Sequence, residues 1–166
     1  MREQGRTIAA AESCTGGLIA EQITDVAGAS DYFLGGVVAY SNAAKAALLG
    51  VPEALLEEHG AVSDPVIRAM AEGVYERFGA DFGVATSGIS GPGGGSSEKP
   101  VGLVHVALTS AEGTHAEHFV FPLDRTRHRL LTAQIALDWV RRALLGVELV
   151  GPQLMRRRGG GAPPGR

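Results

Sequence analysis

A short apolar run that ends in a glycine-containing turn is the feature that most constrains how this chain folds. Residues 7–11 read Thr-Ile-Ala-Ala-Ala, which is short, apolar and partly β-branched, as in a buried strand. Glu12-Ser13-Cys14-Thr15-Gly16-Gly17 comes next, and from Leu18 onward Ile19, Ile23 and Val26 recur at helical spacing. We therefore expect a helix to begin near Thr15 or Gly16, with Ser13 on a tight strand-to-helix turn.

Ser13 has two interpretations at this position. The glycines permit the turn and expose backbone N–H groups at the helix N-terminus, where negative charge is favoured. A serine hydroxyl there can attack a carbonyl carbon while N–H groups between Cys14 and Gly17 hold the developing oxyanion. The alternative is a serine or threonine that only caps the helix, which is very common. Cys14 is a second candidate nucleophile, and Glu12 either orients a catalytic lysine or caps the turn.

A second apolar run supplies the residues that could work with Ser13. Leu34 to Tyr40 is expected to form a strand, and Ala43 to Leu49 is expected to form a short helix that carries Lys45, with Ser41-Asn42 as its cap. Tyr40 and Lys45 would then lie at the same sheet edge as Ser13, because the carboxyl ends of parallel strands build sites in such folds. A lysine among alanines can lose its proton near neutral pH and act as a general base. The alternative is a solvated lysine on a helix surface.

A glycine-rich loop comes directly after the expected strand Phe82 to Thr86. Residues 87–97 contain five glycines and four serines, so their backbone can approach a phosphate or a sugar closely. The loop matches neither the P-loop pattern nor the dinucleotide-binding fingerprint, since strand-like residues rather than a helix come after it. A flexible linker would have a similar composition, but a position directly after a buried strand favours a site.

The remaining pattern predicts an α/β fold, as a single layered domain with a mixed β-sheet flanked by helices. Helices are expected over 52–59 and from a Ser63-Asp64-Pro65 cap, and a hairpin over 101–109 and 115–123. A last helix over 124–145 would bury a stripe that includes Leu130 and Val140. We assign residues 1–150 to this domain and residues 151–166, rich in glycine, proline and arginine, to a disordered tail.

Composition favours a compact cytoplasmic enzyme. Hydrophobic residues make up 45% of the 166 residues, and no run approaches membrane-spanning length, so a membrane partner is not expected. The single cysteine excludes an internal disulfide. Four of the 15 basic residues lie in the tail, which leaves 11 against 18 acidic residues and a net charge of −7 for the body, so nucleic acid is not an expected partner. His115 and His118 are three apart on a strand and face opposite sides, so no metal site is expected.

Several blocks of the sequence resemble one known family. These blocks, in order, are A-E-S-C-T-G-G, F-L-G-G-V-V-A-Y-S-N-x-x-K, L-L-G-V-P, H-G-A-V-S and S-G-I-S-G-P-G-G-G-S-x-E-K-P-V-G-L-V. Together they resemble the carboxy-terminal domain of CinA proteins, the nicotinamide-nucleotide amidohydrolase family, from about Thr7 to Leu145. The resemblance implies hydrolysis of the carboxamide of nicotinamide mononucleotide to nicotinic acid mononucleotide and ammonia, with no cofactor.

The resemblance also implies roles for individual residues. The nucleophile of the family falls on Ser13, its tyrosine on Tyr40 and its lysine on Lys45. Tyr40 is expected to hydrogen-bond the serine–lysine pair or to pass a proton to departing ammonia. Residues expected to contact substrate are Cys14, Thr15, Gly16, Gly17, Ser87, Gly88, Ser90, Gly91, Gly93, Gly94 and Arg125. Arg125 either caps the last helix together with Asp124 or reaches the substrate phosphate, which a guanidinium fits well.

Two other functions remain open at this point. CinA-like proteins are also associated with competence and DNA-damage responses, so a non-catalytic nucleotide-binding or regulatory module is the main alternative. An amidase for a different pyridine or amide substrate is another. The extra amino-terminal domain of full-length CinA is expected to be absent from this chain. The expected partners are a small-molecule nucleotide and further copies of the chain in a homo-oligomer.

Overall fold

The apolar run near the N-terminus forms strand β1 (Ile8–Glu12), whose five residues are all buried. In the computed structural model, which describes residues 1–151, β1 lies inside a five-stranded sheet of order β2-β1-β3-β4-β5. The other strands are β2 (Phe33–Val38), β3 (Phe82–Gly88), β4 (Leu103–Ser110) and β5 (Gly113–Val120). Strand β1 pairs in parallel with β2 and β3, whereas β4 pairs antiparallel with β3 and β5. The mixed sheet predicted from the sequence is confirmed.

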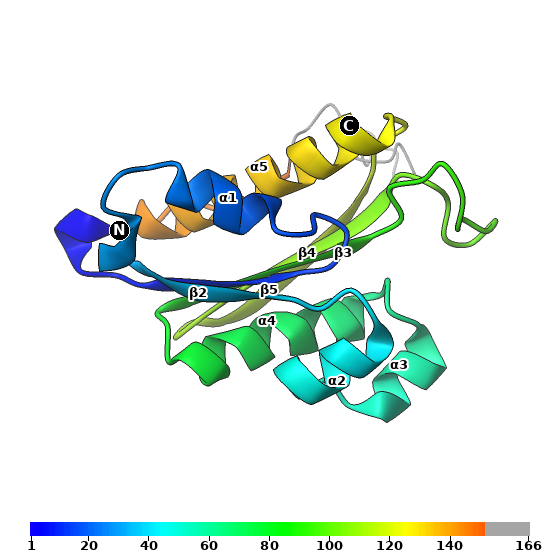
Figure 1. The fold of residues 1–166 in the computed structure, drawn as a ribbon, viewed down its shortest axis with the longest axis horizontal. Helices are drawn as coiled ribbons and strands as arrows, with labels where there is room; N and C mark the ends of the chain where they lie inside the picture. The colour runs from blue at the N-terminus through cyan, green and yellow to red at the C-terminus, as the bar shows by residue number, and fades with distance from the viewer. Residues whose placement is uncertain (152–166) are drawn as a thin grey trace, which may run out of the picture.

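Helices cover both faces of this sheet (Figure 1). Helices α1 (Leu18–Thr24) and α5 (Arg125–Leu144) lie on one face, and α2 (Asn42–Leu49), α3 (Glu53–His59) and α4 (Asp64–Phe78) lie on the other. Successive side chains of a strand point to opposite faces, so Ile8 belongs to the core under α5 while Ala9 belongs to the core under α4. The predicted α/β layered domain is therefore confirmed.

Three details differ from the sequence-based expectations. Helix α1 begins at Leu18 rather than at Thr15 or Gly16, because Gly16 and Gly17 adopt φ angles of +61° and +100°, outside the helical region. Leu130, expected in the core, is 39% exposed, and the buried side of α5 instead carries residues such as His128 and Trp139. The hairpin turn is Ala111-Glu112, since Ser110 pairs with Gly113.

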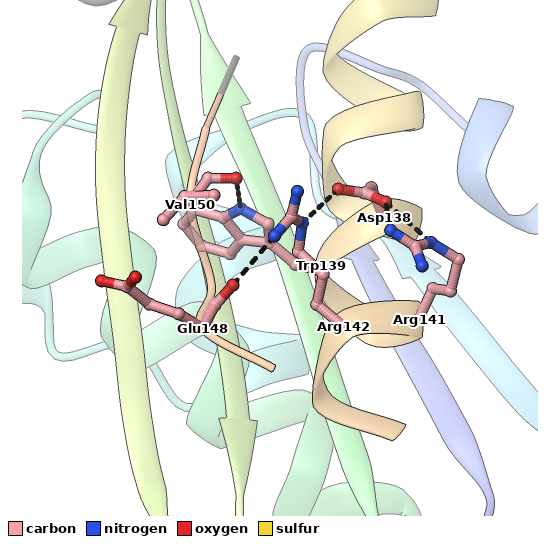
Figure 2. A network of polar contacts seen from close by, with 6 residues as sticks. All are labelled: Asp138, Trp139, Arg141, Arg142, Glu148 and Val150. Atoms are coloured by element: carbon pink, nitrogen blue, oxygen red, sulfur yellow. Dashed lines mark hydrogen bonds and ion pairs between the residues drawn. The ribbon is translucent and has the colours of Figure 1, made fainter. Parts of the chain in front are cut away.

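The segment after α5 folds back along the domain through a polar network (Figure 2). Asp138 accepts hydrogen bonds from Arg141 and Arg142, and Arg142 Nη1 donates to the Glu148 carbonyl at 3.1 Å. The Trp139 indole donates to the Val150 carbonyl at 3.4 Å. Gly151, the first residue of the expected tail, is buried, and the rest of that tail, residues 152–166, lies outside the described residues.

The sheet topology gathers three segments at one edge. Parallel strands β1 and β3 end side by side, with Glu12 opposite Thr86, and β2 ends next to β1, with Val38 opposite Glu12. The turn after β1, the connection from β2 to α2 and the glycine-rich loop after β3 therefore start from the same edge of the sheet. No helix within residues 1–151 is long and apolar enough to cross a membrane.

Candidate active site

Ser13 and Lys45 meet at this edge, although they approach it from different elements. Ser13 comes directly after β1 and is 8% exposed, while Lys45 lies on α2 and is 1% exposed. Ser41 caps α2 by accepting a hydrogen bond from the Ala44 N–H at 3.1 Å, which fixes where the helix starts. Lys45 Nζ then lies 3.2 Å from Ser13 Oγ. The structure thus brings together the two residues that the sequence analysis predicted as nucleophile and base, in a geometry that suits proton transfer.

The surroundings of Lys45 favour a neutral amine. Burial lowers the pKa of its side chain below the ordinary lysine value. No ion pair involves Lys45 among residues 1–151, and Nζ instead lies 2.9 Å from the Ala39 carbonyl oxygen and 3.5 Å from that of Tyr40. A neutral amine has two hydrogens, which these two carbonyls can accept, and its lone pair is then free for the Ser13 hydroxyl proton. The alternative of a solvated lysine does not describe this side chain.

The turn that carries Ser13 is anchored to its neighbours. The Ser13 N–H donates to the Thr86 carbonyl at 2.9 Å, and the hydroxyls of Thr15 and Thr86 are hydrogen-bonded at 2.8 Å. From the other side, Arg129 on α5 donates to the Thr15 carbonyl from Nη2 at 2.7 Å and from Nε at 3.3 Å. Because strand β3 and helix α5 both hold it, the turn keeps the serine in one orientation.

Glu12 caps helix α1 and does not orient Lys45. Its buried carboxylate, 1% exposed, accepts hydrogen bonds from three backbone N–H groups at the start of α1, those of Gly17, Ile19 and Ala20, at 2.9 to 3.1 Å. The choice that the sequence left open is settled by these contacts. They also engage the Gly17 N–H, which was expected among the donors to an oxyanion.

Replacing Glu12 with alanine is expected to destabilise the domain by about 1 to 3 kcal/mol, because three buried or half-buried N–H groups lose their acceptor. Chemical denaturation of Glu12→Ala beside the wild type measures this difference. Glu21→Ala is the matched control, since Glu21 lies on the same helix but is exposed and should change the unfolding free energy little. Equal stability of Glu12→Ala and Glu21→Ala would contradict the capping role.

Cys14 is positioned as a core residue. Burial raises the pKa of its thiol to about 12, with smaller opposing effects from its own N–H and from Arg129. A thiol with that pKa remains protonated at neutral pH, and only the thiolate is a good nucleophile. The geometry therefore favours Ser13 over Cys14 as the attacking group.

Tyr40 points in a different direction from the one expected. Its hydroxyl accepts a hydrogen bond from Arg125 Nη2 at 3.0 Å, and the side chain is 61% exposed. Only its backbone carbonyl faces Lys45, so the expected bond between the hydroxyl and the serine–lysine pair is absent. The reason is alternation: Ala39, the preceding residue, turns into the core, which directs Tyr40 outward.

Arg125 connects Tyr40 to the glycine-rich loop. Besides the tyrosine hydroxyl, its guanidinium donates from Nη1 to the Gly91 carbonyl at 3.0 Å. Asp124 is the residue that caps α5, accepting from the Arg127 N–H at 3.0 Å, so Arg125 is free of the capping role. Arg125 forms no ion pair within the described range, so its charge has no acidic partner there. We call the exposed surface formed by Tyr40 and Arg125 the mouth of the site.

The glycine-rich loop is held at its start and exposed in its middle. Ser90 is buried and its hydroxyl lies 3.0 Å from His128 Nδ1, while His128 Nε2 lies 3.1 Å from the Gly102 carbonyl. Since a carbonyl can only accept, Nε2 carries the hydrogen and the Ser90 hydroxyl donates to Nδ1; burial lowers the pKa of His128, which agrees with a neutral ring. Ser87 donates to the Ala61 carbonyl at 2.8 Å, and Gly88 is half-buried beside β4. Gly93 and Gly94 are exposed.

Two residues of this region, His128 and Arg129, were missed by the sequence analysis. They lie three and four positions after Arg125, so all three are on neighbouring turns of α5 and contact segments of the candidate site. The spacing was visible in the sequence. What the sequence did not show is which side of α5 meets the turn after β1.

The histidines of the hairpin do not form a metal site. His118 lies opposite His105 across β4 and β5, with ring centroids 5.4 Å apart, whereas His115 packs edge-on against Trp139 on the other face. Within residues 1–151 no group of three or more His, Cys, Asp or Glu side chains is arranged to hold a metal ion. Lys45 and Ser13 offer a nucleophile and a base that need no metal.

We therefore expect chelators to leave the activity unchanged. Rates measured in EDTA, after dialysis against it, should equal the untreated rates within about twofold. Loss of activity that a divalent ion restores would contradict a metal-free reaction.

Comparison with known proteins now identifies the family. Residues 1–144 match the model of the CinA C-terminal domain. The chain belongs to the CinA C-terminal domain family. The resemblance inferred from the sequence blocks is thereby confirmed.

Related sequences and structures are similar over most of this CinA domain. It is 56% identical over 144 residues to a CinA-like protein of Geobacter sulfurreducens, which covers 87% of this chain and 35% of that protein. The chain thus spans about a third of the length of the curated relatives that it matches. The competence/damage inducible protein CihA of Agrobacterium tumefaciens has a similar crystal structure, with 44% identity, a TM-score of 0.82 and coverage of 84% of this chain and 86% of that one. The competence damage-inducible protein A (ComA) of Klebsiella pneumoniae is 31% identical, with a TM-score of 0.83 and coverage of 88% and 91%.

Proposed function

We propose that this CinA C-terminal domain hydrolyses the carboxamide of nicotinamide mononucleotide, giving nicotinic acid mononucleotide and ammonia. The observation that carries the proposal is the buried contact between Lys45 Nζ and Ser13 Oγ at 3.2 Å, with the pKa of the amine lowered by burial. A serine next to a neutral lysine is suited to acyl transfer, because the amine can take the hydroxyl proton as the oxygen attacks.

In the first half of the reaction, Lys45 takes the proton from Ser13 as the serine oxygen bonds to the carboxamide carbon. The carbonyls of Ala39 and Tyr40 stabilise the ammonium that forms on Lys45, since both lie within 3.5 Å of Nζ. The developing oxyanion is held by backbone N–H groups of the turn after Ser13. Collapse of the tetrahedral intermediate breaks the carbon–nitrogen bond, and the proton on Lys45 passes to departing ammonia.

In the second half, water hydrolyses the ester formed on Ser13. Lys45, neutral again, removes a proton from the water that attacks the acyl carbon and then returns a proton to the serine oxygen. The reaction as proposed needs no metal and no organic cofactor. Tyr40 takes part through its exposed hydroxyl at the mouth of the site, where it can contact substrate beside Arg125.

The ribose phosphate of the substrate is assigned to the mouth of the site. Arg125 has no acidic partner among residues 1–151 and is held between Tyr40 and Gly91. A guanidinium fits a phosphate well, and the exposed glycines Gly93 and Gly94 leave room for close backbone approach. A small anionic nucleotide is therefore the proposed partner. The expected homo-oligomer stays a prediction, which light scattering of the purified chain tests.

The main alternative is a nucleotide-binding or regulatory module, and some solved relatives are named as competence/damage-inducible proteins. A module that only binds a nucleotide does not need a buried lysine that contacts a serine and has no acidic partner. Ammonia release from nicotinamide mononucleotide, nicotinamide and nicotinamide riboside separates the possibilities. Release from the mononucleotide well above both others supports the proposal. Preference for another amide would change the substrate, and no release from any of them would favour a binding module.

A further inference from the structure

The N–H groups of the turn after Ser13 are not equally available to an oxyanion. The Ser13 N–H donates to Thr86 and the Gly17 N–H to Glu12. Those of Cys14 and Thr15 belong to residues that are only 5% and 0% exposed, so a substrate oxygen has little access to them. The Gly16 N–H has no acceptor among the residues that the structure describes, and Gly16 is exposed three residues after the nucleophile.

Arg129 fixes the peptide group to which this N–H belongs. Its guanidinium donates two hydrogen bonds to the Thr15 carbonyl, from Nη2 at 2.7 Å and from Nε at 3.3 Å. The Thr15–Gly16 peptide bond is trans. In a planar trans peptide the carbonyl and the N–H point in opposite directions. With the Thr15 oxygen held toward α5, the Gly16 N–H points away from α5.

That direction matters because α5 and α2 cover opposite faces of the sheet (Figure 1). Lys45 reaches Ser13 from α2, so an N–H that points away from α5 projects toward the side from which the base acts. The positive charge of Arg129, which forms no ion pair in residues 1–151, also polarises the peptide and strengthens its N–H as a donor.

We propose that Arg129 is a positioning residue that orients the Thr15–Gly16 peptide so that the Gly16 N–H donates to the oxyanion formed during attack by Ser13. The proposal rests on the proposed acyl transfer. It adds Arg129 to the site, a residue 114 positions after Thr15 in the sequence. The rival role for Arg129 is direct binding of the substrate phosphate. The two roles differ in what they change, since an oxyanion donor acts on kcat and a phosphate ligand acts mainly on KM.

The test compares Arg129→Met with two variants of the same helix. Arg125→Met removes the guanidinium at the mouth, and Arg127→Met removes an exposed arginine whose only ion pair within residues 1–151 is with Asp124. We expect Arg129→Met to lower kcat about 10²- to 10³-fold, as for loss of one oxyanion donor, with KM changed less than about threefold. The loss should be the same with nicotinamide mononucleotide and with the riboside. Arg127→Met should keep wild-type rates, and Arg125→Met should raise KM for the mononucleotide alone.

A second measurement tests the role of Arg129 without relying on nicotinamide mononucleotide as the substrate. Acylation by p-nitrophenyl acetate, monitored as a burst of p-nitrophenolate, needs an activated serine but not recognition of a nucleotide. Arg129→Met should slow the burst by a similar factor, and Arg129→Lys should recover part of it, because an ammonium can still donate to the Thr15 carbonyl. Thermal unfolding checks that each variant is folded. If Arg129→Met does not fold, the comparison is made with Arg129→Lys.

The outcomes are distinct. A wild type that is acylated by the ester but releases no ammonia from the mononucleotide overturns the proposed substrate, while the burst still reports on Arg129. An unchanged kcat and burst in folded Arg129→Met, or a defect confined to KM for the mononucleotide, overturns the positioning role. A wild type that does neither reaction overturns both.

Discussion

Ser13→Ala is expected to lower kcat for the amide by about 10⁴-fold or more, because the variant has no oxygen that can form the acyl-enzyme. The fold should survive, since the anchors of the turn do not use the serine side chain: the Ser13 N–H, the Thr15 hydroxyl and the Thr15 carbonyl all keep their partners. Single-turnover ammonia release gives the rate, and calorimetric titration with nicotinamide mononucleotide should show binding within about threefold of the wild type.

Cys14→Ala is the control for this result. Cys14 is adjacent to Ser13, and Cys14 and Thr15 are the other residues of the turn that have a thiol or a hydroxyl. Its thiol is buried and protonated, so its loss should leave most of the activity. If Cys14→Ala abolishes turnover while Ser13→Ala does not, the nucleophile has been assigned to the wrong residue.

Lys45→Arg is expected to be inactive, with kcat lowered about 10³-fold or more. An arginine keeps the positive charge, but its guanidinium stays protonated at any working pH and cannot take the Ser13 proton. Lys45→Met should be equally inactive and still folded, because methionine is an unbranched apolar side chain that fits a buried position. Single-turnover rates of both variants are the measurement. Substantial turnover by Lys45→Arg would show that the lysine supplies only charge.

The pH dependence is set by the direction of the Lys45 shift. Only the unprotonated amine can act as a base, so kcat/KM should rise with pH through the pKa of Lys45 and level off above it. A free lysine has a pKa of about 10.4, and burial lowers that of Lys45, so the rising limb should lie below the ordinary lysine value. Each pH unit below the limb should cost about tenfold in rate. A limb at the ordinary lysine value, in a folded enzyme, would contradict a buried base.

Much of the site could be predicted from the sequence because it is encoded over a few residues. Gly16 and Gly17 permit the left-handed backbone that ends β1 in a turn, and Ser41 marks the start of α2, so the positions of Ser13 and Lys45 on their elements are determined locally. Short apolar runs that alternate with segments of helical spacing predicted the layered α/β class. This pattern is also local, because the side-chain periods of a strand and of a helix can be seen within short segments.

Tertiary structure alone decided how these segments meet. Whether Lys45 was solvated or buried depended on the packing of α2 beside the end of β1, and whether Glu12 met a lysine or three N–H groups depended on where α1 began. Two contacts join residues that are far apart in the sequence. The Tyr40 hydroxyl bonds to Arg125, 85 positions away, and the Thr15 carbonyl bonds to Arg129, 114 positions away. No local pattern specifies which side of α5 faces the turn, because the choice is made by burial of residues such as Trp139 against the whole sheet. The sequence by itself therefore determined the class of fold and predicted Ser13 and Lys45 as nucleophile and base, whereas the burial of Lys45 and the support of the turn arise from contacts that exist only once the layers have packed.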